Sequence, residues 1–122
     1  MRYFELAKRL IKFSDHGQHW IGSVIVQKNR VISMGYNSLK TSPKSKHPYK
    51  SIHSEMRAIW AANPDELKGA SIYVFRQHRD GSLARSFPCQ HCYNLIKESG
   101  IKRIYYTDYD SYAMRKLLEN TL

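Results

Sequence analysis

Two cysteines and one histidine in this sequence have the types and spacing of a metal site. Cys89 and Cys92 are the only two cysteines of the chain, and they follow directly after Pro88. Because residues at i and i+3 share one face of a helix, both thiolates could bind one ion at the start of a helix. His53 supplies a third ligand, and three protein ligands with an open fourth position are typical of catalytic zinc. We therefore expect one Zn²⁺ ion per chain, bound by His53, Cys89 and Cys92.

Glu55 follows the histidine closely enough to take part in the same chemistry. Residues two apart point to opposite sides deep inside a helix, but they can converge at its start, because the capping residue is not yet helical. The sequence therefore predicts that His53 lies at the boundary of a helix over residues 53–62 and Glu55 in its first turn. Zinc lowers the pKa of a bound water to about 7. We expect Glu55 to shuttle protons in a hydrolytic reaction and not to bind the metal.

Two other kinds of site fit part of this pattern. Cys-x-x-Cys at the start of a helix is also typical of thiol redox pairs, but that interpretation leaves His53 and Glu55 unused. A structural zinc site requires a fourth protein ligand, which His47 or His91 could provide. A zinc content near one per chain without hydrolytic activity would favour the structural site.

The two motifs together resemble the signature of the zinc-dependent cytidine and deoxycytidylate deaminase superfamily, His-x-Glu followed by Pro-Cys-x-x-Cys. The motifs read here as His53-Ser54-Glu55 and Pro88-Cys89-Gln90-His91-Cys92. The resemblance covers roughly residues 20–118 and includes Gly35-Tyr36-Asn37, a segment whose asparagine contacts the substrate sugar in the family. It implies a hydrolase that acts on the C–N bond of a cyclic amidine, with Glu55 as the catalytic residue.

The elements expected around the motifs alternate between helices and strands. Helices are predicted over about residues 3–11, 53–62, 88–99 and 111–120, and strands over 21–26, 31–36, 71–75 and 103–107. This order predicts an α/β fold with a mixed sheet and helices on both faces. The resemblance specifies it as a cytidine deaminase-like three-layer α-β-α sandwich of four or five strands. The length of 122 residues fits a single deaminase domain over residues 1–122.

The substrate is harder to predict than the chemistry. The helix expected over 111–120 resembles one that follows the fourth strand in deoxycytidylate, tRNA adenosine and APOBEC-type polynucleotide deaminases, whereas free-nucleoside cytidine deaminases continue into a hairpin. With that helix, a fifth strand is missing or displaced. The basic loop over 38–50 could bind the phosphate of a mononucleotide. We therefore favour conversion of cytosine to uracil in a nucleotide such as dCMP. The alternatives are a cytidine deaminase of single-stranded DNA or RNA, a tRNA adenosine deaminase-like enzyme, and a catalytically silent zinc-binding protein of this fold.

Three residues outside the metal motifs are candidate substrate contacts. Asn37 is one, by its place in the Gly-Tyr-Asn segment. Tyr105 and Tyr106 are the others, because the strand that begins at Arg103 resembles one in polynucleotide deaminases whose tyrosine stacks on the target base. The sequence leaves open which of the two tyrosines faces the pocket.

The overall charge and hydropathy bear on partners and location. The net charge of +10 is compatible with single-stranded nucleic acid bound through a basic surface, and equally with a basic protein that binds none. A homo-oligomer is a further association that the sequence leaves open. Because the sequence lacks a membrane-spanning apolar stretch and a signal-peptide pattern, we expect a cytoplasmic protein without a membrane partner.

Overall fold

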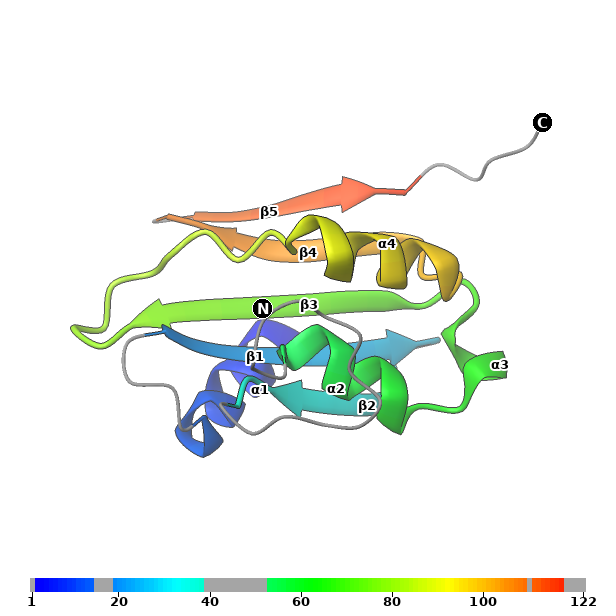
Figure 1. Cartoon of the computed structure of the whole chain (residues 1–122), viewed down its shortest axis with the longest axis horizontal. Coiled ribbons are helices and arrows are strands. Elements are labelled where there is room, and N and C mark those ends of the chain that lie inside the picture. Colours follow the sequence, from blue (N-terminus) through cyan, green and yellow to red (C-terminus); the bar gives the residue numbers. More distant parts are fainter. Residues whose placement is uncertain (1, 15–18, 39–52, 110, 118–122) are drawn as a thin grey trace.

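The computed structural model describes residues 2–14, 19–38, 53–109 and 111–117. Its elements are α1 (Arg2–Leu10), the 3-10 helix η1 (Ile11–Phe13), β1 (His19–Gln27), β2 (Arg30–Tyr36), α2 (Ser54–Ala61), α3 (Pro64–Leu67), β3 (Ser71–His78), α4 (Gln90–Glu98), β4 (Arg103–Asp108) and β5 (Ser111–Lys116). The five strands form one sheet in the order β2-β1-β3-β4-β5 (Figure 1). β3 and β4 are parallel and the other neighbours antiparallel. The predicted mixed sheet is therefore confirmed, with five strands.

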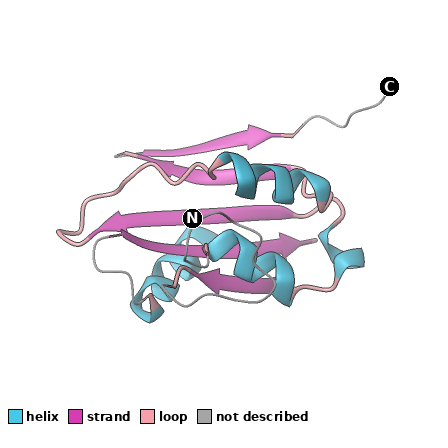
Figure 2. Cartoon of the chain, viewed as in Figure 1, coloured by secondary structure: helices cyan, strands magenta, loops and turns pink. Residues whose placement is uncertain are grey.

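Helices cover both faces of this sheet, as predicted. In the view of Figures 1 and 2, α2 and α4 lie in front of the sheet and α1 lies behind it. Side chains alternate along each strand, so neighbouring residues contribute to two separate cores. The core under α1 includes Phe4, Ala7, Val24, Val26 and Phe75. The core under α2 and α4 includes Ile25, Ala58, Ile72, Ile96 and Ile104.

The turn that joins β1 to β2 follows from its two residues. Lys28 and Asn29 both have positive φ, at 51° and 62°. Two such residues in a row match the right-handed twist of the flanking strands, and Asn tolerates this conformation well. The hairpin predicted from the sequence is confirmed.

Two glycines let helices approach the sheet closely from opposite sides. A Cβ atom on Gly35 of β2 would overlap the Ser54 carbonyl oxygen and lie 2.7 Å from the Ala58 nitrogen of α2. A Cβ atom on Gly22 of β1 would overlap the Ala7 carbonyl oxygen and lie 3.2 Å from the Leu10 Cβ, both in α1. Each helix therefore rests directly on the backbone of a strand.

The helix predicted over residues 111–120 is wrong. Ser111–Lys116 form β5, which pairs with β4 in antiparallel register from Arg103 opposite Lys116 to Asp108 opposite Ser111. Residues 118–120 of the predicted helix lie outside the described residues. Side chains alternate between the two faces along β5, and Tyr112 points toward α1. The centroid of its ring lies 4.5 Å from that of Phe4. Backbone hydrogen bonds to the edge of β4 thus outweigh the helical spacing of apolar residues in this segment.

Within the described part of the chain, no helix has the length and apolarity needed to cross a membrane. The cytoplasmic location and the homo-oligomer stay predictions.

Candidate active site

The starts of α2 and α4 meet on one face of the sheet and bring the two sequence motifs together. His53 is the N-cap of α2 and Cys89 is the N-cap of α4, and both have extended backbones. Cys92 lies one turn into α4 and is fully buried, whereas Cys89 is exposed. The prediction that His53 lies at a helix boundary is confirmed. The sulfurs therefore come from one helix start and the imidazole from another.

The distances among these three side chains fit a zinc ion. His53 Nδ1 lies 3.8 Å from Cys89 Sγ and 3.4 Å from Cys92 Sγ. Tetrahedral zinc with the usual Zn–N and Zn–S bond lengths separates such nitrogen and sulfur ligands by about 3.6 Å. The two measured distances bracket this value, and one imidazole with two thiols is a ligand set that zinc favours.

A fourth protein ligand does not join this set among the residues whose placement is described. The potential ligand atoms of His53, Cys89 and Cys92 all lie within 4.8 Å of one another, and His91 is not part of the group. His47, the other candidate for a closed structural site, falls outside the described residues. Three protein ligands leave a coordination position for water, which is typical of catalytic zinc.

Glu55 is buried beside the metal ligands, in the first turn of α2. The Ser54 hydroxyl donates a 2.7 Å hydrogen bond to Glu55 Oε1, and it lies 2.7 Å from the Ser23 hydroxyl of β1. Because Ser54 gives its only proton to the carboxylate, Ser23 must donate to Ser54. Burial raises the pKa of Glu55, and the hydrogen bond from Ser54 opposes this rise. A buried carboxyl group with a raised pKa is suited to exchange protons near neutral pH.

The ligands also influence one another. A hydrogen bond with Cys89 raises the pKa of His53 more than burial lowers it. The pKa of Cys92 is raised as well, mainly by a hydrogen bond with Cys89 and to a smaller extent by burial. Zinc binds the thiolate form of cysteine and the neutral form of histidine, so metal uptake by these residues is expected to release protons.

The segment that leads into Cys89 is held between β3 and β4. The two strands pair only over Ser71–Val74, and the chain returning after β3 fills the space beyond that pairing. The Ser86 hydroxyl donates to the Val74 carbonyl at 2.7 Å and accepts from the Thr107 backbone nitrogen at 2.7 Å. The Thr107 hydroxyl donates to the Ala84 carbonyl at 2.6 Å. These buried contacts fix the backbone just before the cysteine motif.

The two candidate tyrosines lie on opposite faces of the sheet. Tyr106 belongs to the core under α2 and α4, on the face of the metal ligands, and its ring meets Phe87 edge-on at 5.0 Å. Tyr105 packs on the α1 face, where its ring stacks on Tyr73 at 4.3 Å. This placement corrects the prediction that Tyr105 contacts the substrate. A role for Tyr106 stays a prediction.

Asn37 links the end of β2 to the start of β1. Its Oδ1 accepts a hydrogen bond from the Ile21 backbone nitrogen at 3.0 Å, and its Nδ2 donates to the His19 carbonyl at 2.8 Å. The side chain is almost fully buried. These contacts give Asn37 a structural role that the sequence did not reveal, and its contact with a substrate sugar stays a prediction. Most of the basic loop over 38–50 lies outside the described residues.

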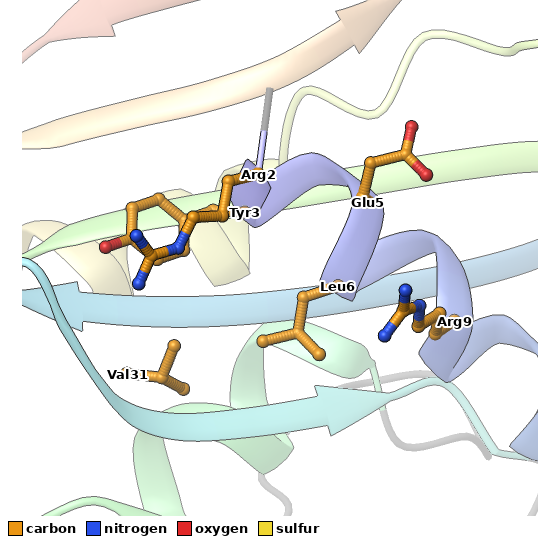
Figure 3. Close-up of a pocket in the computed structure, with 6 residues that line it drawn as sticks. All are labelled: Arg2, Tyr3, Glu5, Leu6, Arg9 and Val31. Atoms are coloured by element: carbon orange, nitrogen blue, oxygen red, sulfur yellow. The ribbon is translucent and has the colours of Figure 1, made fainter.

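A separate pocket of about 370 Å³ lies beside α1, on the other face of the sheet (Figure 3). It is lined by Arg2, Tyr3, Glu5, Leu6, Arg9 and Val31. Because the sheet separates it from the metal ligands, this pocket takes no part in the chemistry of the site.

Comparison with known proteins agrees with this geometry. Residues 1–108 match the family described as the cytidine and deoxycytidylate deaminase zinc-binding region. An uncharacterized deaminase of Aliivibrio fischeri is 30% identical over an alignment of 112 positions, and the match covers 85% of this chain and 69% of that protein. Human deoxycytidylate deaminase is 29% identical over an alignment of 121 positions, and the match covers 82% of this chain and 62% of the human enzyme. The chain thus spans about three fifths of the human enzyme's length.

Two solved structures share the fold. The dCMP deaminase from cyanophage S-TIM5 in its apo form superposes with a TM-score of 0.64 at 18% identity, over 88% of this chain and 80% of that chain. The cytidine deaminase from Burkholderia pseudomallei superposes with a TM-score of 0.66 at 17% identity, over 94% of this chain and 90% of that chain. Both support the cytidine deaminase-like sandwich. The chain belongs to the zinc-binding cytidine and deoxycytidylate deaminase family.

Proposed function

We propose that this protein is a zinc-dependent hydrolytic deaminase that converts the cytosine of dCMP to uracil. The convergence of His53, Cys89 and Cys92, with the buried Glu55 beside them, carries this proposal. The names of the human relative and of the cyanophage structure support dCMP as the substrate. In the reaction a water molecule adds to the amino-bearing carbon of the base and ammonia leaves.

The residues divide this work between them. Zinc held by His53, Cys89 and Cys92 would supply a Lewis acid that activates water at neutral pH. Glu55 accepts a proton from the attacking water and delivers it to the ring nitrogen of cytosine; it then accepts the proton of the added hydroxyl and passes it to the departing amine. Ser54 orients the carboxylate by holding Oε1, while Ser23 fixes Ser54 in turn. Each of these groups lies at a helix start or on a central strand.

A panel of ammonia-release assays tests this function. The zinc-loaded protein is offered dCMP, CMP, deoxycytidine, cytidine, single-stranded DNA, RNA and tRNA, and we expect saturable turnover of dCMP. Glu55→Gln should retain zinc and lose activity by about 10²-fold or more, because it removes the proton carrier. Glu66→Gln is the matched control, since Glu66 forms a surface ion pair with Arg30 at 2.7 Å.

Three outcomes would contradict the proposal. Full zinc loading without ammonia release from any substrate would indicate a catalytically silent member of the family. Activity confined to polymers and falling steeply with salt would indicate a polynucleotide deaminase. Retained activity in Glu55→Gln would contradict the role of that residue.

One observation favours a second candidate substrate, the free nucleoside. β4 continues directly into the antiparallel β5, whereas the sequence predicted a helix there. By the resemblance described above, such a hairpin is typical of free-nucleoside cytidine deaminases. The same panel separates the two candidates, because a nucleoside deaminase would turn over deoxycytidine or cytidine in preference to dCMP.

A further inference from the structure

Arg76 carries a positive charge that its neighbours in the described part of the chain do not neutralise. Its Nη2 lies 2.9 Å from His19 Nδ1, and its Nη1 donates to the Arg85 carbonyl at 3.2 Å. Its Nε is buried, and no atom of the described residues accepts a hydrogen bond from it. A guanidinium has only donors, so His19 Nδ1 must accept and the imidazole contributes no negative charge. Both partners of the guanidinium are therefore neutral.

The described residues supply no carboxylate partner for the Arg76 guanidinium. The two ion pairs among the described residues join Arg30 to Glu66 and Arg85 to Asp108, and neither includes Arg76. The ring of His78 lies 5.7 Å from that of His19, on the same side of the sheet. Withdrawing a cation from water without a counter-ion costs free energy. An anionic ligand would offset this cost.

Arg76 lies on the same face and at the same end of the sheet as the metal ligands. It stands opposite Ile21 in the pairing of β3 with β1, just as Val74 stands opposite Ser23. Ser23 touches Ser54, so Val74 and Arg76 face the start of α2.

The returning segment places Arg76 near the second helix start as well. The Arg76 backbone nitrogen donates to the Thr107 hydroxyl at 3.3 Å, within the network that holds Ser86 before Cys89. The backbone of Arg76 therefore lies between β1, which contacts the start of α2 through Ser23, and the segment that leads into Cys89 at the start of α4.

We propose that Arg76 binds the phosphate group of the nucleotide substrate. This inference rests on the proposed deaminase function and names the residue that distinguishes a nucleotide from a nucleoside. With the base at the metal ligands, the sugar and phosphate extend along the sheet end toward the guanidinium. After the bonds to His19 and Arg85, each of the two Nη atoms keeps one N–H for a phosphate oxygen, and a planar fork of two such donors suits this anion.

The test measures substrate preference, defined as kcat/KM for dCMP divided by kcat/KM for deoxycytidine. Arg76→Gln should lower this ratio by about 10- to 100-fold, the usual effect of losing a charged hydrogen bond. Arg103→Gln is the matched control, because it removes the same charge beside Tyr73, on the other face of the sheet. It should leave the ratio unchanged. Inorganic phosphate should also inhibit deoxycytidine turnover by the wild type more strongly than by Arg76→Gln.

The alternative is that Arg76 only braces the chain returning after β3. In that case both substrates lose activity together and the ratio holds, which would overturn the proposal. A wild-type enzyme without preference for dCMP would overturn it too. Loss of activity on a single-stranded oligonucleotide with an unchanged ratio would assign Arg76 to a backbone phosphate instead.

Two measures keep the outcome clear. If Arg76→Gln does not fold, Arg76→Lys retains the charge without the planar fork and should lower the ratio by a smaller factor of at least about 3. An unchanged ratio in that variant would also overturn the inference. Ammonia release by the wild type, measured first, decides the proposed function separately, because it does not depend on which substrate Arg76 recognises.

Discussion

Replacing Gly35 by alanine should damage catalysis more than its small size suggests. The added Cβ would lie 2.7 Å from the Ala58 nitrogen, and it must move by about 0.7 Å to reach the 3.4 Å of ordinary van der Waals contact. The overlap with the Ser54 carbonyl requires a larger shift. Both obstacles are backbone atoms of α2, so the start of that helix must move away from the sheet. His53 and Glu55 move with it.

The size of the effect follows from that displacement. Overpacking of this kind costs about 1–3 kcal/mol of stability. In a chain of this length the loss should lower the melting temperature by roughly 3–12 °C. A misplacement of about 1 Å at a reacting group can cost about 10²-fold in rate. We therefore expect Gly35→Ala to fold and to lose about 10²-fold in kcat for dCMP.

Gly22→Ala supplies the matched control. Its Cβ would overlap the Ala7 carbonyl of α1, on the face of the sheet that lacks the metal ligands. Both variants should lose comparable stability in thermal and urea unfolding, and only Gly35→Ala should lose kcat when both are assayed well below their melting temperatures. Equal losses of kcat in the two variants would refute the reasoning, as would a Gly35→Ala enzyme with normal kcat.

Two further predictions concern the carboxylate and the metal. Ser54→Ala removes the hydrogen bond that lowers the pKa of Glu55, so this pKa should rise further. Because the carboxylate then forms only at higher pH, the acid limb of the kcat/KM profile should move to higher pH. Ser33→Ala, which removes a buried hydroxyl bonded to Ala58 under the same helix, should leave the limb in place, and a shift of Ser54→Ala to lower pH would contradict the assignment. Removing zinc with a chelator should abolish activity and cost about 4 kcal/mol if free zinc had been about 1,000 times its dissociation constant. Calorimetry should then show a lower melting temperature that one zinc per chain restores, and an unchanged melting temperature would argue against a metal coupled to folding.

The site residues that could be predicted from the sequence are those that lie in short motifs with a recognisable spacing. Local spacing predicts that His53 and Cys89 lie at the starts of helices. The structure confirms this, because each is the N-cap of its helix. Ser23 and Arg76 were missed, because strand register brings them to the site from distant positions. Ser23 lies in an apolar strand, where a serine has no local signal for a role in catalysis. The sequence offers no signal for Arg76, because its neutral partners among the described residues come from other parts of the chain.

The two tyrosines show a different limit. Because side chains alternate along β4, Tyr105 and Tyr106 lie on opposite faces of the sheet. The sequence alone does not indicate which of the two lies on the face of the metal ligands. Register with β3 resolves this, since Tyr106 lies opposite Val74 and Val74 opposite Ser23. A shift by one residue would have exchanged the two tyrosines.

The error at β5 changes how the substrate must be inferred. The predicted helix over 111–120 had linked this chain to nucleotide and polynucleotide deaminases by topology, and the observed hairpin removes that link. Topology then favours the nucleoside, while the named relatives favour the nucleotide. Side-chain chemistry is the remaining criterion, because a nucleoside offers no anion to a guanidinium held by neutral partners. The order of strands and helices favours a nucleoside, but it makes no contact with the substrate. The charge on Arg76 would contact the phosphate itself, and it therefore supports dCMP more directly.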